Sequence, residues 1–543
     1  ILSFSTSLML RSQVLDYGSE LHEFDPFFNF RATEFLVNNG LVEYYNWHDV
    51  KSWYPNGRDI SATSQVMLHV TAATTYQIFG SNMELYDFTI LFPGIVGALT
   101  TIIIFALVRV IGGTTAGLFA SLLFAISVPI IIRGFMGWFK SEPLGLFYGL
   151  FGLYLFLSGI KSDNKKITVS KLIGGGILMA FGLASWGGIQ FFIIPIGIFI
   201  FLLPFLRKDF GFLIWSIPAF VISLLLTTMV FERPGVDFVL GLGGFALILP
   251  TIFLITCSFV QKFSKSENQI RNYLILLLTI ILIGAFLIMF NTENQFLQYP
   301  NYRYLNVINP FLTTTNPLVD SVSEHSVTST YYSFFMHSVL MIFAGLGSWI
   351  IFNKIKFESS KDFPKHLIEF WIIFNKIKFE SSKDFPKDLM VFVLIFGLVG
   401  AYVGSAFVRL ELFTSLSIIF LSSIGLSIII REILNCKNQL HPIRNNIIKF
   451  SYVGGILILI IIPLTFSASN WNSILDTPAI ILNGGSIYNV VTNDWKESLE
   501  WIKLNTPPDS IILSWWDYGY WITTMSERTT LVDNATIDSK QIQ

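Results

Sequence analysis

Long apolar segments recur along most of this 543-residue chain and constrain its fold more than any other feature. A helix needs roughly 17 to 25 predominantly apolar residues to cross the hydrocarbon core of a bilayer. Segments of this kind, starting with the short stretch Ile1 to Leu10, predict about thirteen transmembrane helices within residues 1–467. Only 13% of the residues are charged, far fewer than in a soluble protein. The sequence therefore predicts a polytopic α-helical membrane protein.

The lysines and arginines of the short loops predict the orientation in the membrane. One set of alternate loops carries Arg109, Lys161 to Lys171, and Arg207 with Lys208. Cytosolic loops are enriched in such residues, so we expect this set in the cytosol and the other loops on the extracytoplasmic side. The net charge of −1 and the lack of a basic block predict no nucleic-acid partner.

Two extracytoplasmic loops, residues 11–89 and 291–330, are too long and too polar for simple connections. Loops of that length are usually functional. We expect the transmembrane domain, with these two loops, to span residues 1–467.

After residue 467 the composition becomes that of a globular protein. Asp494 begins an amphipathic helix through Leu499, and a strand follows at Ser510 to Leu513. We therefore expect the start of a mixed α/β extracytoplasmic domain at residues 468–543. Because the chain begins without methionine and ends inside this domain, we expect a fragment that lacks material at both ends.

Acidic residues lie in three of the outer loops. Asp25 and Glu23 lie in the long loop 11–89, Glu142 lies in the next outer loop, and Glu324 lies in the long loop 291–330. Oxygen ligands from several places are what a hard divalent cation requires. The alternative for each residue alone is a solvated surface charge, since acidic loop residues are mostly exposed. Their grouping on one side of the membrane favours a shared site.

Arg409 lies at the outer end of a predicted span, with apolar residues on both sides. An ionisable residue so close to lipid indicates a functional site, and its guanidinium matches a phosphate best. The alternative is an arginine that extends to the interface and pairs with Glu411.

Five aromatic residues occur within seven positions from Trp515 to Trp521, around a single acid, Asp517. Such a cluster often packs in a core. A carboxylate within it needs hydrogen-bond partners if it is buried, so Asp517 could equally receive a polar group of a ligand.

The pentapeptide Trp515-Trp516-Asp517-Tyr518-Gly519 resembles the hallmark of the catalytic subunits of N-oligosaccharyltransferases. The segment Glu23 to Arg31, the segment Ser321-Val322-Ser323-Glu324, and Arg409 resemble further motifs of that family in the same order. The similarity covers nearly the whole chain and implies a GT-C glycosyltransferase-like fold, with features of the archaeal single-subunit type. The location would be the cell membrane in an archaeon or the endoplasmic reticulum in a eukaryote.

The resemblance also implies the reaction. In that family an oligosaccharide passes from a polyprenyl (dolichyl) phosphate or pyrophosphate carrier to asparagine in Asn-x-Ser/Thr of an acceptor polypeptide. The implied roles are catalysis by Asp25, Glu142 and Glu324; binding of Mn²⁺ or Mg²⁺ by Asp25 and Glu142; binding of the donor phosphate by Arg409; and binding of the acceptor hydroxyl by Trp515, Trp516 and Asp517.

One residue departs from the family pattern. The second acidic motif ordinarily starts with an aspartate, where this chain has Lys140. A protonated lysine cannot bind a metal, so either the site has fewer protein ligands or a neighbour such as His325 substitutes.

Two other functions fit parts of the sequence. A protein O-mannosyltransferase that uses a polyprenyl-phosphate sugar has a similar layout but lacks the WWDYG motif. A multi-span transporter would place ionisable or helix-breaking residues at mid-membrane depth in two related halves, whereas the polar motifs here lie in the outer loops.

Overall fold

A computed structural model describes residues 1–207, 211–294, 323–359, 386–435, 442–461, 475–486 and 488–542. The predicted loop 291–330 lies mostly outside the described residues. Within them, seven helices are long and apolar enough to cross a membrane: α5 (Leu85–Ile126), α7 (Ser141–Ile160), α8 (Lys165–Ser185), α9 (Gln190–Leu206), α12 (Leu242–Phe263), α19 (Lys387–Ala406) and α20 (Glu411–Asn435).

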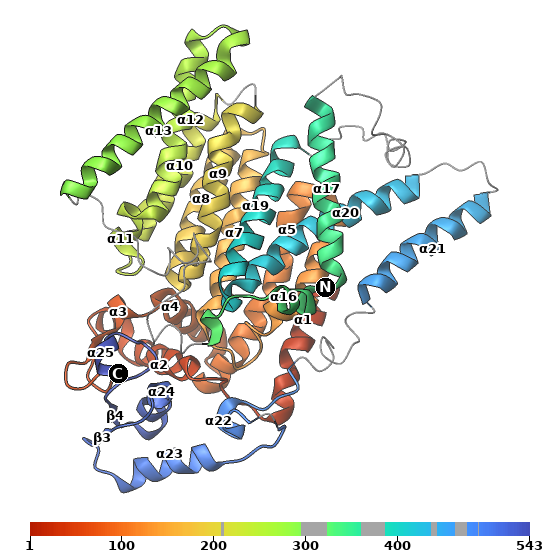
Figure 1. Cartoon of the computed structure of the whole chain (residues 1–543). Helices are drawn as coiled ribbons and strands as arrows, with labels where there is room; N and C mark the ends of the chain where they lie inside the picture. Colours follow the sequence, from red (N-terminus) through yellow and green to blue (C-terminus); the bar gives the residue numbers. More distant parts are fainter. Residues whose placement is uncertain are drawn as a thin grey trace.

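Further apolar helices flank these seven (Figure 1). The pair α16 (Thr330–His337) and α17 (Val339–Ser359) is bent by 93° and forms an eighth candidate span. The others are α1 (Leu2–Ser12), α6 (Val128–Ile131), α10 (Leu213–Thr228), α11 (Gly235–Leu240), α13 (Gln269–Asn294) and α21 (Pro442–Ile461). The polytopic helical fold is confirmed, while the count of about thirteen spans stays a prediction.

Helix α5 is too long to be a single straight membrane span. Its 42 residues would extend about 63 Å as a straight helix, twice the thickness of a hydrocarbon core. Gly113, at φ 80° and ψ 177°, interrupts it. A Cβ atom on Gly117 would lie 2.7 Å from the carbonyl oxygen of Phe105. The arms on either side of Gly113 therefore lie against each other as a helical hairpin.

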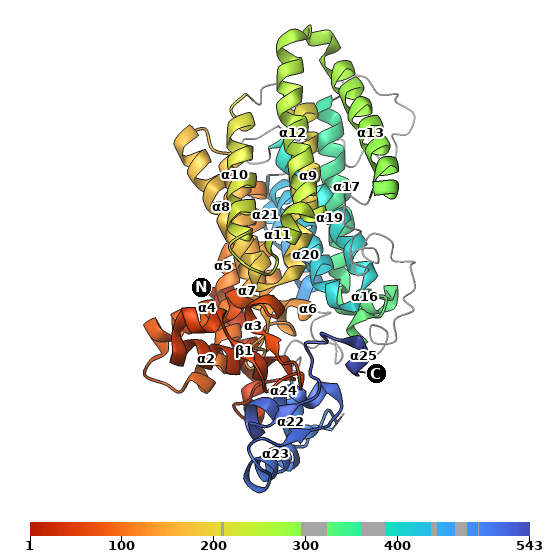
Figure 2. The ribbon, with the colours of Figure 1, turned by 90° about the vertical axis from the view of Figure 1, so that its left-hand side faces the viewer.

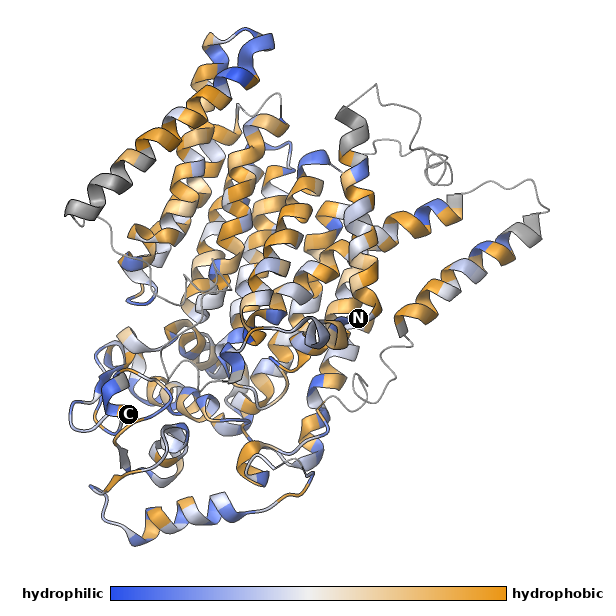
Figure 3. Ribbon diagram, viewed as in Figure 1, coloured by the Kyte–Doolittle hydropathy of each residue, from blue (hydrophilic) through white to orange (hydrophobic). Residues whose placement is uncertain are grey.

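The outer elements gather at one end of the bundle. They comprise α2 (Asp25–Tyr45), the antiparallel pair β1 (His48–Asp49) and β2 (Arg58–Asp59), α3 (Ile60–Thr63) and α4 (Val66–Thr75). Figure 2 shows the C-terminal elements, in blue, beyond this same end. Figure 3 shows hydrophobic residues along the long helices and more hydrophilic residues among the outer elements.

The C-terminal elements partly match the expected domain. They are α22 (Ile480–Asn483), α23 (Asp494–Asn505), the parallel pair β3 (Ile511–Ile512) and β4 (Thr529–Thr530), α24 (Gly519–Trp521) and α25 (Ser539–Ile542). The predicted helix and strand are present as α23 and β3. The helix is preceded by Asn493 as its N-cap, so Asp494 lies in its first turn, where a negative charge is favourable.

Candidate active site

The first acidic residues lie at the start of α2. Asp25 is in the first turn of the helix and Pro26 follows it. The N-terminal end of a helix carries partial positive charge, which stabilises a carboxylate there. Glu23 precedes the helix with a positive φ of 66°. This backbone conformation directs the carboxylates of Glu23 and Asp25 toward the same neighbour, Lys140.

A tight turn before α7 brings Lys140 to these carboxylates. Gly137 has a φ of 87° and a backbone so close to the first loop that a Cβ would lie 2.5 Å from the carbonyl oxygen of Glu20. Lys140 Nζ lies 2.7 Å from Glu23 Oε2 and 3.0 Å from Asp25 Oδ2. Its side chain is only 7% exposed. Lys140 is thus a buried cation shared by two carboxylates.

Glu142, in the first turn of α7, faces a second cation. Arg409 lies in the short helix η7 (Val408–Leu410), and its Nη2 is 2.7 Å from Glu142 Oε1. Its Nη1 is 3.6 Å from Glu324 Oε2. Glu324, in η5 (Ser323–His325), also accepts from Arg133 Nη1 at 2.5 Å. Arg409 therefore joins two of the predicted catalytic carboxylates.

The alternative pairing of Arg409 with its neighbour in sequence does not form among the described residues. Glu411 instead accepts a hydrogen bond from Ser333 and lies 3.3 Å from His337 Nδ1. Tertiary packing directs the two charges of this segment to different partners.

The ion pairs dominate the electrostatics of the site. Burial alone would raise the pKa of Glu324, but Arg133 and Arg409 outweigh burial and lower this pKa to about 2. Burial alone would lower the pKa of Lys140, but Asp25 and Glu23 reverse that effect and raise it. Both groups are therefore charged at neutral pH.

The aromatic motif lies between β3 and α24. Trp515 is 60% exposed, and its Nε1 donates to Asp517 Oδ2 at 3.0 Å. Asn534 Nδ2 donates to the other oxygen, Oδ1, at 3.3 Å. The ring of Trp516 lies 6.2 Å from that of Trp515. Burial raises the pKa of Asp517, and the charge of Asp25 adds to this, so the two acids are close enough to repel.

The residues after the motif pack on the first acidic segment. Trp521 Nε1 donates to the backbone oxygen of Glu23 at 3.0 Å, and its ring lies 4.6 Å from that of Phe24. Thr524 donates to the backbone oxygen of Phe27 at 3.2 Å. The segment that follows the aromatic motif therefore lies against the start of α2, next to the carboxylate cluster.

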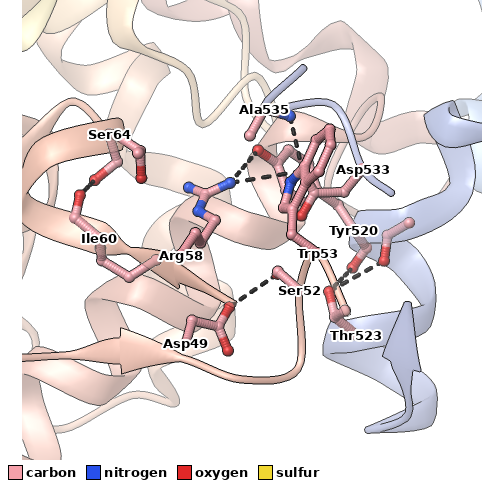
Figure 4. A network of polar contacts seen from close by, with 12 residues as sticks. Asp49, Ser52, Trp53, Arg58, Ile60, Ser64, Tyr520, Thr523, Asp533 and Ala535 are labelled. Atoms are coloured by element: carbon pink, nitrogen blue, oxygen red, sulfur yellow. Dashed lines mark hydrogen bonds and ion pairs between the residues drawn. The ribbon is translucent and has the colours of Figure 1, made fainter. Parts of the chain in front are cut away.

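A buried polar network reinforces this junction (Figure 4). Arg58 Nη1 donates to the hydroxyl of Tyr520 at 3.1 Å and lies 3.6 Å from Asp533 Oδ1. Trp53 Nε1 donates to the same Asp533 oxygen at 2.7 Å. The side chains of Arg58 and Asp533 are 1% and 0% exposed. Sequence reasoning assigned no catalytic or binding role to these residues.

The predicted metal ligands are paired with protein cations. In the described part of the chain, no three His, Cys, Asp or Glu side chains are grouped so as to hold a metal ion. Asp25 contacts Lys140 and Glu142 contacts Arg409, while the ring of His325 lies beside Phe407. As these side chains stand, the donor set does not fit a divalent cation.

The fold and the site define a polytopic helical membrane protein with a cluster of paired acidic and basic side chains at one end of its helix bundle. Residues 9–343 match the family model described as "Oligosaccharyl transferase STT3, N-terminal", and residues 508–541 match the "STT3/PglB/AglB core domain". The chain belongs to the STT3 family of oligosaccharyl transferases.

Relatives from plants and a slime mould support this assignment. The chain is 25% identical to the dolichyl-diphosphooligosaccharide–protein glycosyltransferase subunit STT3B of Oryza sativa subsp. japonica. This match covers 97% of this chain and 73% of that protein. It is 27% identical to the STT3 subunit of Dictyostelium discoideum, over 100% of this chain and 72% of that protein.

Solved structures of an archaeal protein share the fold. The oligosaccharyltransferase AglB of Archaeoglobus fulgidus, in complex with an inhibitory peptide and a dolichol-phosphate, matches with a TM-score of 0.70 at 15% identity. The match covers 98% of this chain and 64% of that one. A complex of the same archaeal protein with Zn and sulfate matches with a TM-score of 0.65 at 15% identity, over 98% of this chain and 62% of that one. The chain thus spans just under two thirds of the archaeal protein.

Proposed function

We propose that this chain transfers an oligosaccharide from a polyprenyl (dolichyl) phosphate or pyrophosphate to the side-chain amide of asparagine in Asn-x-Ser/Thr. The observation that carries this proposal is the packing of Trp521, two residues after the WWDYG motif, on the acidic start of α2, where its Nε1 donates to the backbone oxygen of Glu23. This packing supports a site in which the acceptor hydroxyl binds next to the carboxylates. The names of the relatives and the dolichol-phosphate and peptide bound to the archaeal neighbour agree with such substrates.

The donor phosphate would bind at Arg409. A guanidinium matches a phosphate through two parallel hydrogen bonds, and Arg409 is already fixed by the carboxylates of Glu142 and Glu324. Arg133 lies on the other side of Glu324 and adds a second positive charge. These two arginines would stabilise the charge that collects on the leaving phosphate.

The acceptor amide would be held by carboxylates. An amide nitrogen is a poor nucleophile because its lone pair is delocalised into the carbonyl. Asp25 and Glu324 would accept hydrogen bonds from the two N–H groups and reduce this conjugation. The nitrogen then forms a bond to the anomeric carbon, the bond from that carbon to the phosphate oxygen breaks with its electron pair on the phosphate, and one amide proton ends on the released phosphate.

The acceptor hydroxyl would bind at the aromatic motif. Asp517 would accept its hydrogen bond, while Trp515 and Trp516 would cover the Ser or Thr side chain. Trp515 and Asn534 already hold the carboxylate of Asp517 in place. Fixing the residue two positions from the asparagine orients the nitrogen and increases the rate through proximity.

A metal-dependent form of the same reaction is the second candidate. Mn²⁺ or Mg²⁺ would be held by Asp25 and Glu142, and Glu142 Oε2 is buried without a hydrogen-bond partner among the described residues. The Zn and sulfate complex of the archaeal neighbour favours this form. It requires Lys140 to leave Asp25.

The site would face the extracytoplasmic side. Helix α7 starts at the carboxylate cluster and ends at Ile160, about 30 Å away along its axis. Arg109, Lys161 and Lys171 line a cavity at that far end, and such residues are enriched on the cytosolic side.

Transfer to three acceptor peptides tests the proposal. We expect purified chain in detergent, supplied with a lipid-linked oligosaccharide, to glycosylate an Asn-x-Thr peptide and an Asn-x-Ser peptide, and to leave the Asn-x-Ala peptide essentially unmodified. The Ala peptide is the matched control because it lacks only the hydroxyl. Sugar attached to Ser or Thr oxygen, or equal transfer to all three peptides, would contradict the proposal.

Replacing Arg133 by methionine is expected to shift the pH dependence of transfer. The pKa of Glu324, now about 2, would rise toward the ordinary value of about 4.3. Because the ionised carboxylate is the active form, it is lost as pH falls through this pKa, so the variant should lose activity at a higher pH than the wild type. Rates measured between about pH 2 and 7 check this, and an unchanged acid limb would refute the role of Arg133.

A further inference from the structure

We propose that the ammonium group of Lys140 takes the place of a divalent cation in this site, so that glycan transfer by this chain needs no metal ion. The inference rests on the proposed function and concerns the positive charge that positions the carboxylates proposed to hold the acceptor amide.

The geometry makes Lys140 a fixed part of the acidic cluster. Its Nζ bridges Glu23 Oε2 and Asp25 Oδ2 at 2.7 and 3.0 Å. Its backbone N–H donates to the oxygen of Trp138 at 2.7 Å, and its ammonium lies 4.8 Å from the centre of the Trp138 ring. These contacts and the burial of the side chain hold the cation in one place.

A metal ion and this ammonium compete for the carboxylate of Asp25. Mg²⁺ binds carboxylate oxygens at about 2.0 to 2.1 Å, and a second cation beside the same carboxylate repels the ion. Asp25 Oδ2 is already within 3.0 Å of Lys140 Nζ. The second predicted ligand, Glu142, is held by Arg409 in the same way. A divalent ion bound between Asp25 and Glu142 would be repelled by Lys140 and Arg409, which already neutralise these two carboxylates.

The charge of the cluster gives an independent reason. Four carboxylates, those of Glu23, Asp25, Glu142 and Glu324, face three cations, those of Arg133, Lys140 and Arg409. An aspartate at position 140 would lower the net charge by two units. A bound divalent cation would restore those two units. Lys140 is therefore the electrostatic equivalent of an aspartate together with a divalent metal ion.

Exchanging the lysine for aspartate tests the equivalence. The wild type is expected to transfer glycan equally in EDTA and in Mn²⁺, within about twofold, and to give no bound-Mn²⁺ signal in electron paramagnetic resonance. Lys140→Asp is expected to bind Mn²⁺, to lose about 100-fold in rate in EDTA, and to recover at least about tenfold with Mn²⁺. Lys140→Met should lose activity that Mn²⁺ does not restore.

The control and the contrary outcomes separate this inference from the proposed function. Lys503→Asp changes the charge at an exposed pair with Glu527, and it should behave as the wild type in both assays. A wild type that transfers glycan only with Mn²⁺, or that binds Mn²⁺ in place of the Lys140 contacts, overturns the inference and leaves the function intact. A wild type that transfers no glycan in EDTA or in Mn²⁺ overturns the proposed function. If Lys140→Asp does not fold, the wild-type rates in EDTA and in Mn²⁺ still decide whether transfer needs a metal ion.

Discussion

Replacing Arg409 by methionine is expected to lower the rate of glycan transfer by about 100- to 1000-fold, the usual loss when one preorganised donor to a developing charge is removed. Two roles disappear together. The leaving phosphate loses its guanidinium partner, and Glu142, whose side chain is only 1% exposed, keeps a buried charge without its cation. A single substitution therefore affects both the donor and the acceptor sides of the site.

The measurement is transfer from a lipid-linked donor to an Asn-x-Thr peptide under single-turnover conditions. Arg409→Lys keeps the charge but not the planar fork and should recover only part of the rate. Arg271→Met, on the exposed start of α13, is the matched control and should leave transfer unchanged. A rate for Arg409→Met within a few fold of the wild type would exclude Arg409 as the phosphate ligand.

Replacing Arg58 by methionine is expected to release the C-terminal segment from the outer loop, at a cost of about 3 to 5 kcal/mol. Asp533 would remain buried without a charge partner, and one of its oxygens already has no hydrogen-bond partner among the described residues. Limited proteolysis should then cleave the chain beyond α21 much faster, and transfer should fall with it.

A double variant distinguishes a lost pair from general damage. Asp533→Asn removes the buried charge that Arg58→Met leaves unpaired. The loss of unfolding free energy in the double variant should therefore be smaller than the sum of the losses in the two single variants. Lys503→Met is the control, because its exposed pair with Glu527 should contribute about 1 kcal/mol or less. Equal protease resistance of Arg58→Met and the wild type would show that the network does not hold the segment.

Hydropathy and charge predicted the membrane fold, because long apolar helices have a local signature. Helix α23 and strand β3 were predicted for the same reason, from periodicity within a few residues. The break of α5 at Gly113 and the 93° bend at Ser338 occur at single residues with positive φ inside apolar segments. A count of apolar segments does not predict the position of such breaks.

Sequence reasoning named charged residues that lie close together, but it did not predict how they pair, and their roles stay predictions. The structure brings together Asp25, Glu142, Glu324 and Arg409. Sequence reasoning left two partners open for Arg409, its neighbour Glu411 or the phosphate of a ligand. Its actual partner, Glu142, lies 267 positions away, and Asp533 lies 480 positions from Trp53. Contacts at such separations leave no local pattern. Lys140 is the exception, since its charge alone predicted that the metal site would differ.

The position of η7 between α19 and α20 has a consequence for how the donor arrives. Arg409 lies in the short helix between two helices that are apolar enough to cross a membrane, so we expect its guanidinium at the level where a bilayer changes from hydrocarbon to headgroups. In the proposed reaction, a carrier lipid would bring its phosphate to this arginine while its long tail stays among other lipids. The tail would then never enter water, and the chain would only have to bind a headgroup that diffuses along the membrane surface.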